Sequence, residues 1–200
     1  SAAARASANF LSESHQQDLG TGIRTTGSVT LSAAQDLSAQ AAHIESDTGT
    51  VSLSAARDLA ITAGETDASF AQGTEFRDSG LFSSSTSTRR IASEQHNAQS
   101  SAVSGSVVRL QAVRDLQVRG SDVAGDQLTQ MNADRDVSIA ATTETASSES
   151  YSHDTQSGLL SGPGLSIGIG SRSQQDTSKV QRSREHGSQV GALEGDVSIS

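Results

Sequence analysis

Three histidines are the side chains of this sequence that could best ligate a metal ion. His15, His96 and His186 each follow a glutamate within two residues, in the strings ESH, EQH and EH. Imidazole is the commonest metal ligand, so three imidazoles on one face could bind a metal. Ligation needs several convergent groups, however, and tens of residues separate these three. We therefore expect each histidine to bond to backbone neighbours where a strand returns, and we predict no metal or cofactor.

Four aspartates with similar neighbours are the second set of residues that could hold a cation. They are Asp36, Asp58, Asp115 and Asp136. Nonapeptide β-roll repeats bind Ca²⁺ in glycine-rich turns of the type G-G-x-G-x-D, and this sequence contains no such turn. An aspartate carboxylate also bonds to nearby backbone N–H groups, which makes aspartate a favourable turn residue. We predict that all four aspartates are structural turn residues.

The sequence offers little support for catalysis. Serine is abundant, but no G-x-S-x-G elbow accompanies a candidate base. The glycine-rich string IGIGS at residues 167–171 follows no strand-to-helix phosphate-binding pattern. The carboxylates are spread along turns, whereas a carbohydrate-active β-helix would gather them in a groove. We predict no catalytic residue and no enzyme activity. The competing hypothesis is a carbohydrate-active enzyme with a β-helix fold.

Composition alone would favour a disordered chain. The 200 residues are 33% hydrophobic and 2% aromatic, and their net charge is −9. A pI near 4.9 argues against a nucleic-acid partner, which would require a basic face. There is no cysteine and therefore no disulfide, and no apolar run approaches the roughly 20 residues that span a bilayer. The opening SAAARASANF has no apolar signal-peptide core, so we expect an internal fragment of a longer protein.

Internal repetition argues against disorder. Residues 27–42 and 49–64 are identical at nine of sixteen positions, and related copies occupy residues 106–123 and 128–144. Residues 195–200 resemble the opening of a fifth copy. Five residues before each repeated aspartate stands a large apolar residue, and apolar residues follow at one and three positions after it. This alternation predicts strands with one buried face. The residues that we expect to stack as one interior ladder are Leu31, Leu53, Leu110 and Met131.

The spacing of the copies predicts how these strands pair. Copies one and two, and copies three and four, lie 22 and 21 residues apart. An antiparallel meander would not need a constant register at this spacing, whereas one coil of a parallel β-helix has about this length. Each coil would then stack on the next at about 4.8 Å. The predicted fold class is therefore all-β, a parallel β-helix.

Two segments outside the repeats predict excursions from the helix. The expected organisation is the end of an excursion at 1–26, two coils at 27–67, an excursion at 68–104, two coils at 105–146, a hairpin excursion at 147–194 and the start of a coil at 195–200. The alternation of Leu165, Ile167 and Ile169 after Gly162-Pro163-Gly164 predicts a turn and a strand. The string GLFSSSTSTRR would be a shorter counterpart of this hairpin.

All aromatic residues fall in these excursions. They are Phe10, Phe70, Phe76, Phe82 and Tyr151. Aromatic side chains are favoured anchors of binding surfaces, so Phe70, Phe76, Phe82 and Tyr151 are candidates for partner contact. The other interpretation is that they attach each hairpin to the flank of the helix, because exposed aromatics on a filament invite aggregation. The sequence leaves both interpretations open.

The coil strings GSVTLSAAQDLSAQAA and RLQAVRDLQVRGSDV and the excursion GLLSGPGLSIGIGSRSQQDTSKVQRSREHGSQVGALEGDVSIS carry a family resemblance. They resemble the haemagglutinin repeats of filamentous haemagglutinin-like exoproteins. The second repeat region of contact-dependent growth inhibition proteins is the most similar. The resemblance extends over essentially the whole chain. The first excursion departs from the pattern, because it lacks the Gly-Pro-Gly and Ser-Ile-Gly-Ile-Gly segment.

The resemblance implies a very long chain that a two-partner secretion system exports from a Gram-negative bacterium. Its partners would be a dedicated outer-membrane transporter, neighbouring repeats of the same chain and the surface or outer membrane of a target cell. The chain would fold at the bacterial surface, associated with the outer membrane, as a right-handed parallel β-helix. It would then serve as an adhesin filament or as the stalk that delivers a toxin. A pure spacer without binding of its own is the further alternative.

Overall fold

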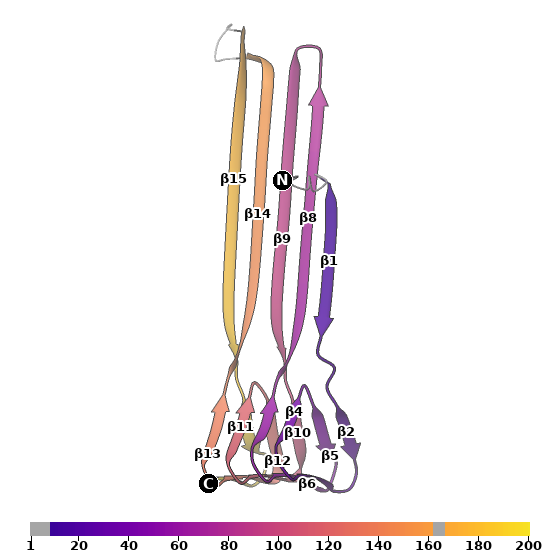
Figure 1. The fold of residues 1–200 in the computed structure, drawn as a ribbon, viewed down its shortest axis with the longest axis vertical. Helices are drawn as coiled ribbons and strands as arrows, with labels where there is room; N and C mark the ends of the chain where they lie inside the picture. Colours follow the sequence, from indigo (N-terminus) through magenta and orange to yellow (C-terminus); the bar gives the residue numbers. More distant parts are fainter. Residues whose placement is uncertain (1–8, 162–166) are drawn as a thin grey trace. The chain divides into compact units, whose positions relative to one another are not determined.

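The computed structural model describes residues 9–161 and 167–200, and these residues form strands without any α-helix (Figure 1). The all-β prediction is therefore confirmed for the described part of the chain. Consistent with this, no helix among those residues could cross a membrane. The expected turn at Gly162-Pro163-Gly164 and the residue Leu165 lie outside the described residues.

The described strands belong to two compact units. The first, here called the hairpin unit, comprises Ser1–His15, Asp67–Gln95 and Thr145–Arg182. The second, called the coil unit, comprises Gln16–Thr66, His96–Glu144 and Ser183–Ser200. Each unit gathers segments that are far apart in the sequence, because the repeated strings alternate with the excursions along the chain.

The strands of the coil unit form three columns, and a coil is one segment from each column in chain order. The first column contains β2 (Gly22–Thr25), β5 (His43–Ser46), the starts of β10 (Ala102–Ala112) and β12 (Asp122–Ala133), and β16 (Gln189–Ala192). The second contains β3 (Val29–Ala33), β6 (Thr50–Ala55), the ends of β10 and β12, and β17 (Asp196–Ile199). The third contains β4 (Leu37–Gln40), β7 (Leu59–Thr62), β11 (Asp115–Arg119) and β13 (Asp136–Ala140). Every pairing within these columns is parallel.

The core of the coil unit is built from the inward positions of these strands. In β6, burial alternates along TVSLSA, and Val51, Leu53 and Ala55 are the buried residues. The same alternation in the paired strands brings Leu59, Ile61, Val108 and other aliphatic residues into one buried cluster. Small and branched aliphatic side chains fill this core, and none of the aromatic residues belongs to it. Repetition thus supplies a continuous core that a single copy could not bury.

Buried hydroxyls mark one corner of the coils. Ser101 and Ser121 are fully buried, each two residues before a core valine, Val103 or Val123. The Oγ of Ser101 donates to the carbonyl oxygen of Thr62 at 2.7 Å and accepts from the N–H of Ala42 at 2.9 Å. A buried hydroxyl without partners would be costly, so these bonds allow a polar residue to occupy the corner.

The excursions form one sheet in the strand order β1-β8-β9-β14-β15. These strands are β1 (Phe10–Gln17), β8 (Gly64–Ser79), β9 (Ser83–Gln99), β14 (Thr142–Ser161) and β15 (Ile167–His186). Neighbouring strands run in opposite directions (Figure 1). Between β8 and β9 the chain reverses in a tight turn, where the N–H of Gly80 donates to the carbonyl oxygen of Ser83 at 2.7 Å.

The two hairpins are joined edge to edge. Strand β9 of the first pairs with β14 of the second. The hydroxyls of Ser84 and Ser157 lie 2.8 Å apart across this junction, and the Oγ1 of Thr155 donates to the carbonyl oxygen of Thr86 at 3.4 Å. Excursions separated by two coils of sequence are therefore neighbours in a continuous sheet.

Strand bounds and expected ranges differ at the ends of the excursions. The returning strands end at Gln99 and His186, so residues 101–104 and 189–192 fall outside the hairpins. Val103 pairs with Ile44 and Val123 in the first column of the coil unit. This column was not expected from the sequence, because its residues stand at variable distances from the repeated aspartates.

Candidate functional site

The four residues expected to form an interior ladder occupy one register of the second column. Leu31 pairs with Leu53, Leu53 with Leu110, and Leu110 with Met131. Leu53, Leu110 and Met131 are 0–1% exposed, and Leu31 is partly buried against the core. At the end of the column, Met131 pairs with Ile199 of β17. Any function of these side chains is therefore to hold successive coils together.

The four repeated aspartates lie where the second column turns into the third. Asp36 and Asp58 immediately precede β4 and β7, and Asp115 and Asp136 begin β11 and β13. The carboxylate of Asp36 accepts from the N–H of Asp58 at 3.3 Å, and that of Asp58 accepts from the N–H of Asp115 at 3.2 Å. Each of these bonds reaches the neighbouring coil, so the carboxylates act between coils.

Arginines complete these contacts between coils. The Nε of Arg57 donates to Asp36 Oδ1 at 3.0 Å, and its terminal nitrogen bonds the other carboxylate oxygen. Arg135 holds both oxygens of Asp115 in the same way, with Nε 2.7 Å from Oδ1. Between these pairs, Arg114 Nε lies 3.7 Å from Asp58 Oδ1. Sequence reasoning missed this function of the arginines, although the string RD in three copies was an available signal.

These ion pairs shift the titration of their members. The hydrogen bond from Arg57 lowers the pKa of Asp36 below its ordinary value, and the N–H of Asp58 lowers it further. The hydrogen bond from Arg135 likewise lowers the pKa of Asp115. All four partners are well exposed to solvent. Their contribution is therefore mainly the geometric specificity of a bidentate arginine–carboxylate pair.

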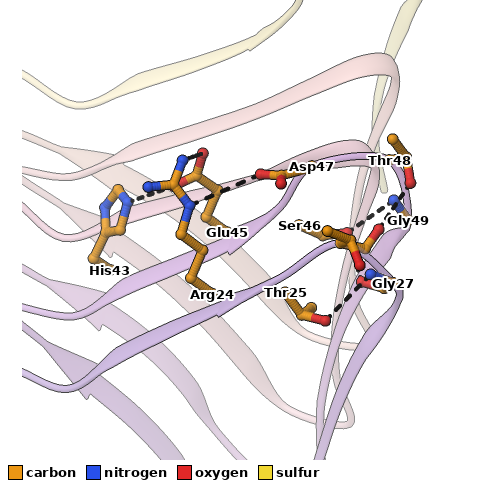
Figure 2. A network of polar contacts seen from close by, with 10 residues as sticks. Arg24, Thr25, Gly27, His43, Glu45, Ser46, Asp47, Thr48 and Gly49 are labelled. Carbon is orange, nitrogen blue, oxygen red and sulfur yellow. Dashed lines mark hydrogen bonds and ion pairs between the residues drawn. The ribbon is translucent and has the colours of Figure 1, made fainter.

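A second polar network lies between the first two coils (Figure 2). Arg24 Nη2 lies 3.1 Å from Glu45 Oε1, and His43 Nε2 lies 3.0 Å from Glu45 Oε2. At the adjoining turn, the buried Ser46 donates to the carbonyl oxygen of Gly27 at 2.7 Å and accepts from the N–H of Gly49 at 2.8 Å. The bonds of Arg24 to Glu45 and of Ser46 to Gly27 join neighbouring coils, whereas His43 and Gly49 bond within their own coil.

Of the three candidate histidines, His186 lies beside a serine and a glutamate. Its Nε2 lies 2.6 Å from the Oγ of Ser100, and its Nδ1 lies 3.6 Å from Glu144 Oε1. Arg184 binds Glu144 Oε2 through Nε at 2.9 Å and through a terminal nitrogen at 2.7 Å. Glu144 Oε1 also accepts from the N–H of Ala98 at 3.2 Å. The carboxylate of Glu144 therefore connects the ends of β9 and β15 to the start of β14.

The carboxylate of Glu144 is held in its ionised form. Burial raises its pKa, but the hydrogen bonds from Arg184 and from the N–H of Ala98 more than offset this, and the net pKa is lowered. Serine, histidine and a carboxylate in this order could in principle activate a nucleophile. The distance of 3.6 Å from His186 Nδ1 to Glu144 is too long for a hydrogen bond, and Arg184 already occupies that carboxylate. The geometry fits a structural connection between strands.

The strand order separates the three histidines. His15 lies on β1, His96 on β9 and His186 on β15, and another strand stands between each successive pair. Among the residues that the structure describes, no group of three His, Cys, Asp or Glu side chains could hold a metal ion. The described strands therefore do not bring the three histidines together.

The aromatic residues are distributed over the hairpin unit. Phe76 and Phe82 are each 69% exposed, whereas Phe70 and Tyr151 are partly buried. Phe10 packs over Gly73, where a Cβ atom would lie 2.3 Å from the Phe10 ring. Tyr151 is stacked with His153, with ring centroids 6.4 Å apart. The structure thus gives Phe76 and Phe82 the exposure that a partner would require.

A shallow concavity of about 500 Å³ lies on this sheet. Phe10 and Tyr151 line it from β1 and β14, and the small residues Ala71 and Ala92 line it from β8 and β9. Three charged residues, Glu75, Arg90 and Glu149, also reach it. Arg77 bonds Glu75, so that carboxylate is already partnered. The concavity has mixed chemistry and does not define a ligand.

Comparison with known proteins places these features in a family. The model of the family described as "Hemagglutinin repeat" matches residues 80–200, which is more than half of the chain. This match includes the third and fourth copies of the repeated string and the second hairpin. No solved structure gives a significant match to the chain.

Several curated proteins are similar to parts of the chain. A protein of Yersinia mollaretii named "tRNA nuclease CdiA" is 41% identical over 103 residues, which is 50% of this chain and 4% of that protein. One from Enterobacter cloacae named "16S rRNA endonuclease CdiA" is 31% identical over 184 residues, 90% of this chain and 6% of that protein. A "tRNA nuclease CdiA" of Burkholderia pseudomallei is 30% identical over 116 residues, 56% of this chain and 9% of that protein. The chain therefore spans less than a tenth of the length of these relatives.

Proposed function

Because the chain belongs to the hemagglutinin repeat family, we propose that it is a non-catalytic structural and interaction segment of a large secreted protein of the bacterial surface. The observation that carries this proposal is the register of the coil unit, in which the repeated strings stack in parallel. A stack of this kind extends by adding coils, as solenoids do. The carboxylates of Asp36, Asp58 and Asp115 are engaged in contacts between neighbouring coils, which supports a structural function.

In this proposal, the parallel columns are part of a right-handed parallel β-helix. Parallel pairing in three columns supports it, as does the ladder of Leu31, Leu53, Leu110 and Met131 in one register. The turn aspartates and their arginines hold that register from outside. The β-helix forms a stalk, and the excursions supply a sheet on which Phe76 and Phe82 are exposed.

The stalk acts in toxin delivery at the surface of a target cell, after export by an outer-membrane transporter of a two-partner secretion system. The similar proteins are named as nucleases, which favours a function in toxin delivery over that of an adhesin without a toxin. Because the chain corresponds to a small part of those proteins, nuclease activity would reside in another part of a longer protein. Contact with the target cell is made by the hairpin unit.

The experiment tests the function of the hairpin unit independently of that of the coil unit. In the longer protein, residues 157–173 are replaced by a short Gly-Ser turn and the exposed Phe76 and Phe82 by serine, and export, attachment to target cells and toxin delivery are measured. We expect export and β-sheet circular dichroism to persist while attachment or delivery is lost. A matched variant carries Ser52→Ala in the coil unit and should retain all three activities. Normal delivery after the hairpin replacement would overturn the proposed function of the hairpin unit.

A further inference from the structure

In the hairpin sheet, the last strand of one excursion pairs with the first strand of the next. Strands β8 and β14 follow the repeated strings along the chain and are called outgoing, and β1, β9 and β15 precede the next strings and are called returning. The strand order pairs β1 with β8 and β9 with β14. In both cases a returning strand of one excursion lies beside the outgoing strand of the next. The described strands therefore contain the same junction twice.

The net charge of the strands alternates between outgoing and returning strands. The outgoing strand β14 carries three carboxylates and no Lys or Arg, and β8 carries four carboxylates and one arginine. The returning strand β15 carries four Lys or Arg and two carboxylates, and β9 carries two arginines and one carboxylate. The short β1 carries one glutamate and departs from this pattern. Apart from β1, each acidic outgoing strand therefore has net basic returning neighbours.

The ion pair of Glu144 with Arg184 shows the consequence of this alternation within the second hairpin, whereas the contact of Glu144 across the β9–β14 junction is a bond from a backbone N–H. Glu144 of β14 accepts from the N–H of Ala98 of β9 on one side and pairs with Arg184 of β15 on the other. Opposite charges on facing strands stabilise a sheet, and like charges destabilise it. The alternation therefore favours the pairing of an acidic strand with a basic one, in addition to the backbone hydrogen bonds.

Strand β15 ends the strand order of the described sheet. Residues 168–185 of β15 are all exposed, and the net basic charge of the strand includes Arg172, Lys179 and Arg182. The unpaired edge of a strand presents a row of N–H and C=O groups that another strand can bind. The edge has the direction and charge of β9, whose corresponding edge binds the acidic β14.

We propose that the free edge of β15 is a docking site for an extended, acidic, Ser/Thr-rich strand, supplied by the outgoing strand of another copy of this repeat. Docking continues the sheet by a third junction of the same kind. The backbone provides most of the affinity, and the charge of the incoming strand provides the selection against returning strands. Excursions of successive repeats thereby join into one sheet along the protein.

The test uses a synthetic peptide with the sequence of residues 142–158, the acidic part of β14. Hydrogen exchange of the 200-residue chain is measured with and without this peptide, and binding is measured by fluorescence anisotropy. We expect protection of amides in residues 168–185 and weaker binding at higher salt. A control peptide carrying Glu144→Lys, Glu149→Lys and Asp154→Lys should bind at least tenfold more weakly.

Variants of the 200-residue chain test the contribution of the basic residues of β15. K179E/R182E should weaken binding of the acidic peptide about tenfold and should improve binding of the lysine peptide. R109E/R119E changes charge equally at exposed positions of the coil unit and should leave binding unaltered. Equal binding of both peptides, protection of β1 instead of β15, or no protection at millimolar peptide would overturn the proposal. A dimer that protects β15 without peptide would also overturn it, because a second β15 would then be the occupant.

Discussion

Arg57 of the second coil binds both carboxylate oxygens of Asp36 in the first coil. Arg135 repeats this relationship with Asp115, and Arg114 lies near Asp58 between them. Each arginine immediately precedes the aspartate of its own coil, so the coils that contain Arg57, Arg114 and Arg135 each place a guanidinium beside the aspartate of the coil before them. The string RD therefore specifies coil-to-coil register from the outer surface.

These pairs predict an acid-sensitive part of the stability. The pKa values of Asp36 and Asp115 are lowered in the folded chain, so the ionised carboxylates favour folding. This contribution is complete above the ordinary aspartate pKa of about 3.9 and is lost as the pH falls through the lowered folded values. We expect Asp36→Asn to reduce the loss of stability on acidification, measured by urea unfolding between neutral pH and pH 2.

The control for this prediction is Asp134→Asn, because Asp134 makes no side-chain ion pair among the described residues. Its acid dependence should match that of the unmodified chain. Salt should diminish the difference between the variants, since the pair is exposed and therefore screened. The same acid dependence in Asp36→Asn and in the unmodified chain would contradict the prediction.

The interior ladder predicts a large difference between adjacent residues of β6. Leu53 is fully buried between Leu31 and Leu110, whereas Ser52 points to the outer side of the same strand. Leu53→Ala should lower the free energy of unfolding by about 2–5 kcal/mol, through lost burial and the cavity that remains. Ser52→Ala should change it by less than about 0.5 kcal/mol. Chemical denaturation of the two variants would check the register, and equal losses would argue against it.

The coil unit shows best which features could be predicted from the sequence. Alternation around the repeated aspartates predicted strands, and the expected ladder residues Leu31, Leu53, Leu110 and Met131 occupy paired positions. The first column escaped notice because its residues lack a constant spacing. Ile44 precedes Leu53 by nine residues, whereas Val103 precedes Leu110 by seven. The difference is absorbed between the registers Ser104–Glu45 and Val107–Thr50, because β10 advances by three residues where the earlier coil advances by five.

Contacts between distant segments were harder to predict. Arg57 could be recognised as a partner of Asp36 only once the coils were known to be adjacent. The pairing of β9 with β14 left no hydrophobic signal, because these strands are rich in Ser and Thr on both faces. Their charge alternation becomes meaningful only when the strand order is known.

The corner at Gly120 predicts an effect of backbone conformation. Gly120 has a φ of 56°, in the left-handed region, and a Cβ atom there would lie 2.5 Å from Thr142 Cγ2. Gly120→Ala should therefore lower the free energy of unfolding by at least about 1–2 kcal/mol, from conformational strain alone. Gly191→Ala is the control, since its Cβ would meet no atom within 4 Å. Thermal unfolding would compare them, and equal midpoints would show that the corner relaxes without cost.

Glu144 predicts that one carboxylate stabilises the junction of three strands. Its side chain is 12% exposed and binds Arg184, with the N–H of Ala98 as a further donor. Glu144→Ala leaves both donors without their acceptor, so the free energy of unfolding should fall by about 1–3 kcal/mol. Glu144→Gln keeps an acceptor oxygen but not the charge, and should recover part of this loss. Glu149→Ala, at an exposed position of the same strand, should have little effect. Urea unfolding would rank the three variants. If Glu149→Ala lowered the free energy of unfolding as much as Glu144→Ala, the contacts of Glu144 would not be the cause of its effect.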